Sequence, residues 1–559
     1  DLHIPSGTTL TRGVGGYSLT VKRHVTIDNG GHYAHNSQPL ILGGLGGVAG
    51  DLTDSNLLPN SLQDLGPVTV STATKTMTTA IAASSVDILS RLNLSTNAIT
   101  VSGSITGGGT LAASGSEVIT VGASMSVTTF TPYVTSNVVF NGGSTSNCNG
   151  YTFYDLTMSK TGNGVVFEPS ANIRVQRSFT MTLGNFTPGN LTHIIAGNWD
   201  SRTVILSSTG STIALSSANP SISLDPAQSF NNLTLQQGGT LATDIAVAGN
   251  FVVASIAAGH LTRGILHTLS VAGDFTLTTA PGATRTPGTA TVSLSGGTQA
   301  LTTNAQAFNN LTLATNTGPV NVAGTLAVNN DLEVYVGRTL AMTTNALSVA
   351  GNTNSLATIA GTITSTSGTQ SFTGDFEIGS LTPSSATTTF YGSAVHVHTL
   401  GISTGTCLFS RTSDQTLYTD GGNFNNLTIA LNTNPKTVIV SGALNVGGNL
   451  EVDSGQTIDL ATNNAPLTVV GNTNAALGGT VGTITAGSGA LLFEGNFVIA
   501  SLTASSTTST FWSNVTLNTF SANTGTVVMA GAAAAPTFTP NGVTFNALSV
   551  TRTAGTLST

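Results

Sequence analysis

The sequence predicts an all-β protein built as a parallel β-helix, or β-solenoid, in which the chain coils repeatedly around one core. Three observations predict this fold: a phrase that returns along the chain, a shorter period of about 23–24 residues inside it, and a composition of only 7% charged residues. A fixed period indicates that one supersecondary unit is stacked many times. Stacked units make long objects with large surfaces, which favours structural or binding roles.

The returning phrase is Phe-Asn-Asn-Leu-Thr followed by an aliphatic residue. It occurs at Phe230–Leu235, Phe308–Leu313 and Phe424–Ile429, and looser copies begin at Phe153 and Phe545. In a stacked coil each position lies above itself in the next layer. We therefore expect the five Phe side chains to pack as core ladders and the Asn side chains to form amide ladders at a turn. N-glycosylation is the functional alternative, because Asn-Leu-Thr fits the acceptor pattern.

The shorter period is marked by Gly-Asn or Gly-Asp ahead of an apolar run. Gly448, Gly471 and Gly495 stand 23 and 24 residues apart. Between such marks lie short alternations of apolar and small polar residues, such as Leu467–Val469, which are typical of half-buried strands. Gly, Asn, Asp and Ser punctuate these runs as turn residues do. A unit of this size, holding two or three short strands, fits one coil of a solenoid.

The long repeat extends beyond the Phe phrase. Phe376 and Phe390 match Phe497 and Phe511 at an offset of 121 residues, which equals about five coils. We therefore predict an irregular solenoid segment over residues 1–150. A regular repeat solenoid follows over residues 151–559, with repeat starts near residues 153, 230, 308, 424 and 545.

The sequence also suggests one helical segment within this fold and one alternative architecture. The one stretch that we assign to a helix is Ile81–Leu94. A tandem array of immunoglobulin-like β-sandwiches is the alternative architecture, because its units of about 100 residues are close to the long spacing. The inner period argues against that array, since a sandwich has no reason to repeat at such a short length.

The motifs also resemble a known class of proteins. The Phe-Asn-Asn-Leu-Thr phrase, with Gly-Asn-Leu-Glu-Val at Gly448–Val452 and Leu-Thr-Val-Val-Gly-Asn at Leu467–Asn472, resembles the repeats of large bacterial secreted β-helix proteins. These include cell-surface adhesins and the filamentous-haemagglutinin-like class. The resemblance covers roughly residues 150–559 well and residues 1–150 loosely. It implies a right-handed parallel β-helix, an extracellular location, and a role in adhesion or surface structure.

Both ends of the sequence read as the middle of a repeat. Asp1-Leu2 resembles Asp331-Leu332, and Phe545 opens a fresh copy of the phrase. Solenoids need capping elements to remain soluble monomers, and open strand edges are templates for pairing. We expect neighbouring molecules to stack head to tail, although a segment of a longer repeat protein would look the same. The residues expected at the assembly ends are Asp1, Leu2, Ile4, Leu548, Val550 and Leu557.

No constellation of residues predicts catalysis. The acidic residues are scattered, and the sequence lacks a phosphate-binding Gly-rich loop, a nucleophile elbow and the calcium-binding repeats. Gly259-His260 with Arg263 is interpreted as a solvated turn and not a lyase site. The sequence therefore predicts a protein that is not an enzyme and has no cofactor.

The histidines provide the candidates for metal ligands. His396 and His398 are two residues apart, so on a strand they point to the same face. His32 and His35 lie near His24. A metal site needs three or four convergent ligands, and the sequence does not identify the others, so we predict surface histidines at both places.

Cys148 and Cys407 are 259 residues apart. In a regular solenoid this separation places them about ten coils apart, which is too far for a disulfide. Each is predicted to be a buried small hydrophobe or a free thiol. An intermolecular disulfide is the alternative.

The charge and composition of the chain indicate which classes of binding partner to expect. The net charge is −8, the pI is about 5.5, and Lys22-Arg23 is the one adjacent basic pair, so nucleic-acid binding is not expected. No membrane span is predicted. We expect a secreted structural subunit of a bacterial filament, sheath or surface layer, whose main partner is itself. An adhesin stalk or passenger that binds glycans or other surface proteins is the alternative.

Overall fold

A computed structural model of the protein describes residues 1–43, 48–56, 63–254, 267–278, 289–314, 316–354, 361–430, 435–476, 481–531, 537–540, 542 and 544–552. These residues contain no helix, and 53% of them are strand in all-parallel stacked coils, about 25 turns in all. The predicted parallel β-solenoid is confirmed. None of the described residues belongs to an apolar helix long enough to cross a membrane.

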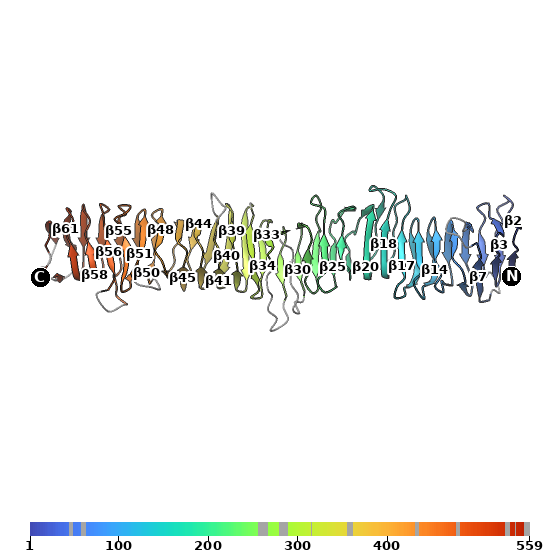
Figure 1. Cartoon of the computed structure of the whole chain (residues 1–559), viewed down its shortest axis with the longest axis horizontal. Helices are drawn as coiled ribbons and strands as arrows, with labels where there is room; N and C mark the ends of the chain where they lie inside the picture. The colour runs from blue at the N-terminus through green and yellow to red at the C-terminus, as the bar shows by residue number, and fades with distance from the viewer. Residues whose placement is uncertain are drawn as a thin grey trace. The chain divides into compact units, whose positions relative to one another are not determined.

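The chain divides into two compact units. The first contains the described residues up to Leu269, and the second contains those from Ser270 onward. Within each unit the strands follow one another as successive layers along the chain (Figure 1).

The first unit is built around two large sheets. One has the order β1 (Leu2–Ile4), β4 (Val25–Ile27), β7 (Gly50–Asp54), β9 (Thr74–Met77), β12 (Arg91–Asn93), β14 (Ile105–Ala112), β11 (Ser85–Ile88), β8 (Pro67–Val70), β6 (Leu40–Leu42) and β3 (Leu19–Val21), with β16 (Met125–Thr131) also on β14. The other has the order β10 (Ile81–Ala83), β13 (Ile99–Val101), β15 (Val118–Val121), β17 (Asn137–Phe140), β18 (Thr152–Ser159), β20 (Arg174–Leu183), β22 (Thr192–Ile195), β25 (Thr212–Leu215), β27 (Asn232–Leu235) and β30 (Phe251–Val253). Shorter ladders complete these coils. The first pairs β2 (Thr9–Thr11) with β5 (His32–Ala34), the second contains β19 (Val166–Phe167), β21 (Asn185–Phe186) and β24 (Ile205–Leu206), and the third contains β23 (Trp199–Asp200), β26 (Ser221–Ser223) and β28 (Thr240–Leu241). The unit also contains β29 (Ile245–Val247), and β31 (Thr268–Val271) lies at the division between the units.

The second unit has three long ladders. The first has the order β32 (Phe275–Leu277), β34 (Gln299–Thr302), β37 (Gly318–Ala323), β40 (Arg338–Thr343), β42 (Thr362–Ser365), β44 (Phe376–Thr382), β46 (Ala394–Leu400), β48 (Gln415–Thr419), β51 (Lys436–Ser441), β54 (Gln456–Asp459), β56 (Thr483–Thr485), β58 (Phe497–Thr503), β60 (Val515–Ser521) and β62 (Phe538–Pro540). The second is β35 (Ala307–Phe308), β38 (Leu326–Val328), β41 (Leu347–Val349), β43 (Gln370–Phe372), β45 (Thr387–Phe390), β47 (Thr406–Phe409), β50 (Asn426–Ile429) and β53 (Leu450–Val452). The third is β49 (Asn423–Phe424), β52 (Leu444–Val446), β55 (Leu467–Val469), β57 (Leu491–Phe493), β59 (Thr508–Phe511), β61 (Thr526–Gly531) and β63 (Ala547–Arg552). A shorter ladder contains β33 (Thr291–Leu294), β36 (Asn310–Leu313) and β39 (Leu332–Val334).

The period-2 pattern places one face of each strand in the core. In β55 Leu467 and Val469 are buried, whereas Thr468 between them is partly exposed. Glycines mark the corners because coils approach closely there. A Cβ on Gly471 would lie 2.4 Å from the backbone of Gly448, and the Gly471 N–H donates to the Gly448 carbonyl at 3.0 Å. Only glycine fits such an approach without a shift of the backbone.

Coil length is not constant. Leu444 pairs with Leu467, and Leu467 pairs with Leu491, so these two coils have the period that the sequence predicts. Leu491 then pairs with Ser509, which makes the next coil several residues shorter. Loops at the corners absorb these differences while the strands keep their register.

Two of the sequence-based interpretations are wrong. Ile81–Leu94 contains the short strands β10, β11 and β12 and no helix. Bends at Ser84 and Ser90 interrupt the alternation of apolar residues along these strands, and the resulting spacing resembles that of a helix. The tandem-sandwich alternative is excluded by the pairing, since immunoglobulin-like sheets are antiparallel and the pairings here are parallel.

Candidate functional site

The returning phrase has a structural role in each coil. Phe153, Phe230, Phe308 and Phe424 are buried, at most 3% exposed, and Phe545 is half-buried against Phe520 and Phe538 at ring distances of 5.4 and 5.3 Å. These residues form core contacts, and Phe545 also lines a pocket beside Phe520.

The two Asn residues of the phrase connect neighbouring coils. Asn425 Nδ2 donates to the Thr404 carbonyl of the preceding coil at 2.9 Å. Asn426 Oδ1 accepts from the Asn449 N–H of the following coil at 2.9 Å. The same contacts recur at Asn231 and Asn232, with distances of 3.3 and 2.8 Å. The amide side chains are therefore engaged in the predicted ladder, which argues against the glycosylation alternative.

The predicted assembly residues lie on the first and last described strands. Asp1 directly precedes β1 and is exposed, and on β1 Leu2 is half-buried and Ile4 is buried. On β63 Leu548 and Val550 are 46% and 51% exposed. Leu557 lies outside the described residues.

The remaining candidates from the sequence are dispersed. His24 lies 3.4 Å from Asp51, but His24, His32 and His35 form no three-ligand group in the described parts of the chain. Cys148 and Cys407 are both free and buried. Gly259-His260 and Arg263 lie outside the described residues.

One group of side chains gathers the chemistry that metal binding requires. It comprises Glu377 on β44, His396 and His398 on β46, and Asp420 directly after β48, and we call it the His-acid cluster. Glu377 lies opposite His396, which lies opposite Tyr418 in the next coil. His396 and His398 share one face of β46 as the sequence predicts. The register continues to place Gly379 and Asp420 on either side of His398, so no side chain separates His398 from Glu377.

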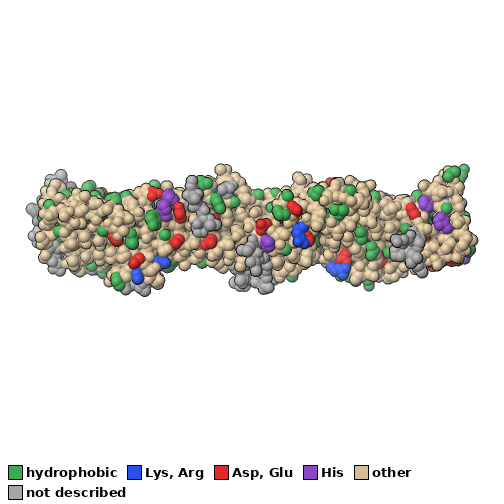
Figure 2. All heavy atoms as spheres, turned by 45° about the horizontal axis from the view of Figure 1, so that its top comes forward, with side chains coloured by type: hydrophobic (Ala, Val, Ile, Leu, Met, Phe, Trp, Pro, Cys, Tyr) green, Lys and Arg blue, Asp and Glu red, His purple; other side chains and the backbone are tan. Residues whose placement is uncertain are grey.

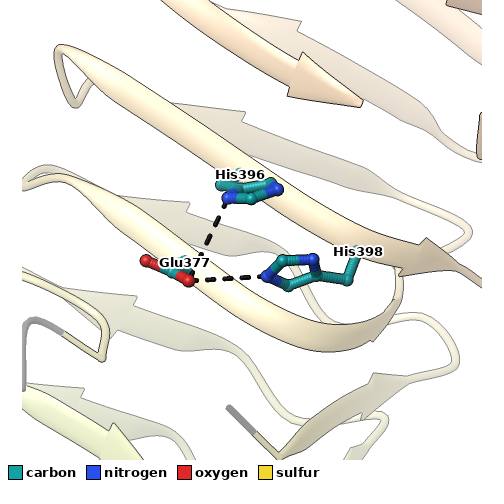
Figure 3. Close-up of side chains that lie close together, drawn as sticks. All are labelled: Glu377, His396 and His398. Atoms are coloured by element: carbon teal, nitrogen blue, oxygen red, sulfur yellow. Dashed lines mark hydrogen bonds and ion pairs between the residues drawn. The ribbon is translucent and has the colours of Figure 1, made fainter. Parts of the chain in front are cut away.

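The side chains of the cluster point toward one another (Figure 3). His398 Nδ1 lies 2.8 Å from Asp420 Oδ2, and His398 Nε2 lies 3.4 Å from Glu377 Oε1. His396 Nδ1 is 4.0 Å from the same Glu377 oxygen, and its Nε2 is 3.8 Å from Asp420 Oδ2. The ligand atoms of Glu377, His396 and His398 all lie within 4.8 Å of one another.

The cluster is partly open to solvent. Side-chain exposure is 40% for Glu377, 28% for His396, 38% for His398 and 52% for Asp420. A pocket of about 440 Å³ adjoins it, lined by Glu377 and His396 with Thr353, Asp375 and Tyr418 among others. The Tyr418 ring packs 5.4 Å from the His396 ring. The molecular face in Figure 2 is otherwise mostly uncharged, with acidic and histidine side chains in a few small groups.

The long repeat supplies a natural comparison for the cluster. Phe372, Phe376 and Phe390 pack with ring distances of 4.4, 5.7 and 5.1 Å, and Phe493, Phe497 and Phe511 repeat this arrangement at 4.3, 5.4 and 5.1 Å. The two copies therefore share the same three-ring packing.

In the second copy the cluster positions carry different residues. Val498 stands opposite Thr516, as Glu377 stands opposite His396, and Asn518 takes the place of His398. The same backbone thus folds with an uncharged set at these positions. The charged set is an addition that the scaffold does not need.

Sequence reasoning identified two of the four members and missed Glu377 and Asp420. Glu377 precedes His398 by 21 residues and Asp420 follows it by 22. Both separations are shorter than the period that the sequence displays most clearly, so a single fixed period places neither acid beside a histidine. The local signal that could have found them is the pairing of strands coil by coil.

Chemically, two imidazoles and two carboxylates can hold a divalent cation or share protons in ion pairs. Comparison with known proteins gives no match: no family model fits the sequence, and no curated protein or solved structure is significantly similar to it.

Proposed function

We propose that the protein is a structural subunit of an extracellular bacterial filament, sheath or surface layer, and that it assembles through the strands at the ends of its coil stack. The resemblance of its repeats to secreted β-helix proteins supports the location. The near absence of charge supports association, because weak mutual repulsion lets neighbouring surfaces approach.

The observation that carries the proposal is the contrast between two successive strands. Val527 and Met529 on β61 are 3% and 1% exposed because β63 covers them. Leu548 and Val550 occupy the same register positions on β63 and are 46% and 51% exposed. Among the described residues β61 is the strand paired with β63, and a strand of the same kind from a second copy would pair with its other edge and bury both side chains. A contact between unlike ends builds a filament when the rotation between neighbouring copies does not close a ring.

The test compares assembly of the full chain with that of two variants by electron microscopy and sedimentation at rising concentration. We expect the full chain to form filaments and L548D/V550D to form none, because charged side chains cannot be buried at the joint. The control is I402D, which places an aspartate at a residue that is 97% exposed and away from the end strands. I402D is expected to assemble normally, and circular dichroism checks that all three proteins fold.

Two results would refute the proposal. One is a monomeric full chain at every concentration, which would favour the adhesin-stalk alternative. The other is equal assembly of L548D/V550D and the full chain, which would exclude β63 from the joint.

A further inference from the structure

We propose that Glu377, His396 and His398 bind one divalent transition-metal cation of the zinc class, and that Asp420 positions His398 for this role. The site is separate from the end strands, so the inference does not depend on the proposed assembly.

The donor atoms select the class of cation. Imidazole nitrogen suits zinc, copper, nickel and iron, whereas magnesium and calcium prefer oxygen ligands alone. Two imidazoles and one carboxylate are a common protein contribution to a zinc site that keeps a position open for water or another ligand. The partial exposure of the cluster leaves that position accessible.

The distances from Glu377 fit with small adjustments, and the ligand atoms of His396 and His398 lie within 4.8 Å of each other. Ligand atoms bound at about 2.0–2.1 Å in a tetrahedral zinc site stand roughly 3.3 Å apart. His398 Nε2 and Glu377 Oε1 already lie 3.4 Å apart. His396 Nδ1 is 4.0 Å from the same oxygen, which a small side-chain rotation closes because His396 is not fully buried.

Asp420 determines which nitrogen of His398 is free to bind. It lies 2.8 Å from Nδ1, so it accepts the proton of that nitrogen and leaves Nε2 as the lone-pair donor facing Glu377. A carboxylate behind a metal-bound histidine fixes the tautomer and the ring orientation and raises the basicity of the ligand. The geometry thus assigns Asp420 a positioning role and not that of a ligand.

The two carboxylates of the His-acid cluster also favour a bound cation. The carboxylates of Glu377 and Asp420 both lie within ion-pair distance of His398. A divalent cation between Glu377 and the histidines would balance the negative charge of these two carboxylates. The uncharged second copy, with Val498, Thr516 and Asn518, shows that the fold itself does not require this concentration of charge.

The test is a calorimetric titration of the full chain with zinc ion, and with magnesium ion as the comparison cation. We expect zinc to bind and magnesium to leave the site empty. The variant E377V/H396T/H398N installs the residues of the second copy, which the same backbone accommodates, and is expected to lose one zinc equivalent per chain. The variant D420N is expected to retain the stoichiometry with affinity lowered roughly 10–100-fold.

A matched control removes two other imidazoles. H3N/H32T changes two exposed histidines of the first unit and is expected to keep the zinc equivalent. Circular dichroism without metal confirms that each variant folds. The proposal is overturned if the full chain binds no zinc, or if E377V/H396T/H398N binds as many equivalents as the full chain. Unchanged affinity in D420N would remove the positioning role of Asp420.

Discussion

The side-chain oxygen of Asn449 accepts a hydrogen bond from the backbone N–H of Asn472, 3.0 Å away and one coil further on. Asn472 then offers its own Oδ1 to the Asn496 N–H at 2.9 Å. Asn426 precedes both in the same series, accepting from the Asn449 N–H at 2.9 Å. Each asparagine therefore satisfies a backbone donor at the corner of the next coil, where no strand pairing is available.

Removing one acceptor from this series tests its contribution. Asn472→Ala leaves the Asn496 N–H without its partner, and we expect the change to lower stability by about 1 kcal/mol. Chemical denaturation measures the loss, and amide hydrogen exchange shows whether the Asn496 N–H is the group exposed.

The control for this change is Asn472→Asp, which keeps the acceptor oxygen. Asp375 already acts in the equivalent way, accepting from the Ser393 N–H at 2.7 Å. We expect Asn472→Asp to retain most of the stability. Equal losses in both variants would show that the side-chain oxygen is not what stabilises the corner.

Glu117 predicts a loss of stability in acid. Burial alone would raise the pKa of this carboxyl, but hydrogen bonds from the backbone N–H groups of Ser114, Gly115 and Thr96, at 2.6, 2.8 and 3.0 Å, outweigh it and lower the pKa. A carboxyl whose folded pKa is depressed stabilises the protein above its unfolded pKa, and this stabilisation is lost as pH falls through the folded pKa.

The corresponding variant is Glu117→Gln. At neutral pH we expect it to be less stable than the parent by about 2 kcal/mol, because the charge-assisted hydrogen bonds are lost. The difference should shrink as pH falls, because the parent carboxyl becomes neutral as well. Denaturant titrations at several pH values measure it, and a constant difference down to low pH would contradict the assignment.

The pKa of Lys160 predicts a second contribution that rises with pH, in the alkaline range. The residue is 2% exposed, its ammonium lies 5.9 Å from the centre of the Phe140 ring and contacts Ser146 Oγ, and burial lowers its pKa from 10.5 to about 8. A lysine whose folded pKa is depressed releases its proton more readily in the folded state. The contribution of Lys160 to stability should therefore rise with pH between about 8 and 10.5, the interval in which the unfolded chain still holds the proton.

Lys160→Met keeps most of the length of the side chain and removes the titrating group. We expect the stability of the parent relative to this variant to increase with pH over this interval, because the other titrating groups are common to both proteins and cancel in the comparison. Parallel pH profiles for the two proteins would mean that another group carries the slope.

The fold could be predicted from the sequence because each coil repeats the same physical solution. The Phe phrase, the corner glycines and the period-2 runs each indicate the structure of one coil. The predicted core positions of Phe230, Phe308 and Phe424 are buried as expected. The His-acid cluster could be predicted only in part. Strand alternation places His396 and His398 on one face, but the acids that meet them come from other coils, and variable corners decide which acid lies opposite.

The helix assigned to Ile81–Leu94 failed for a related reason. Ile81, Ala83, Val86 and Ile88 are all buried, and their uneven spacing arises from a strand face interrupted by a bend. Periodicity within one segment does not separate this case from a helix, whereas pairing with the neighbouring coils does.

The burial of the two cysteines predicts that their thiols react slowly while the protein is folded. Cys148 and Cys407 are 0% and 2% exposed, and burial raises the pKa of both thiols, that of Cys407 to about 12. The thiolate is the reactive form, so a buried thiol with a raised pKa is slow to react. We expect a chromogenic disulfide reagent at mildly alkaline pH to label neither cysteine in the folded protein and both in denaturant.

A variant with one exposed thiol validates this measurement. Ile402→Cys places a cysteine at a residue that is 97% exposed, and one equivalent should react at once. Disulfide-linked dimers should form in this variant on oxidation and not in the parent chain. Rapid labelling of the folded parent would show that one of the two cysteines becomes accessible, and it would restore the intermolecular disulfide as an explanation for assembly. Slow labelling would exclude a disulfide between copies through Cys148 or Cys407.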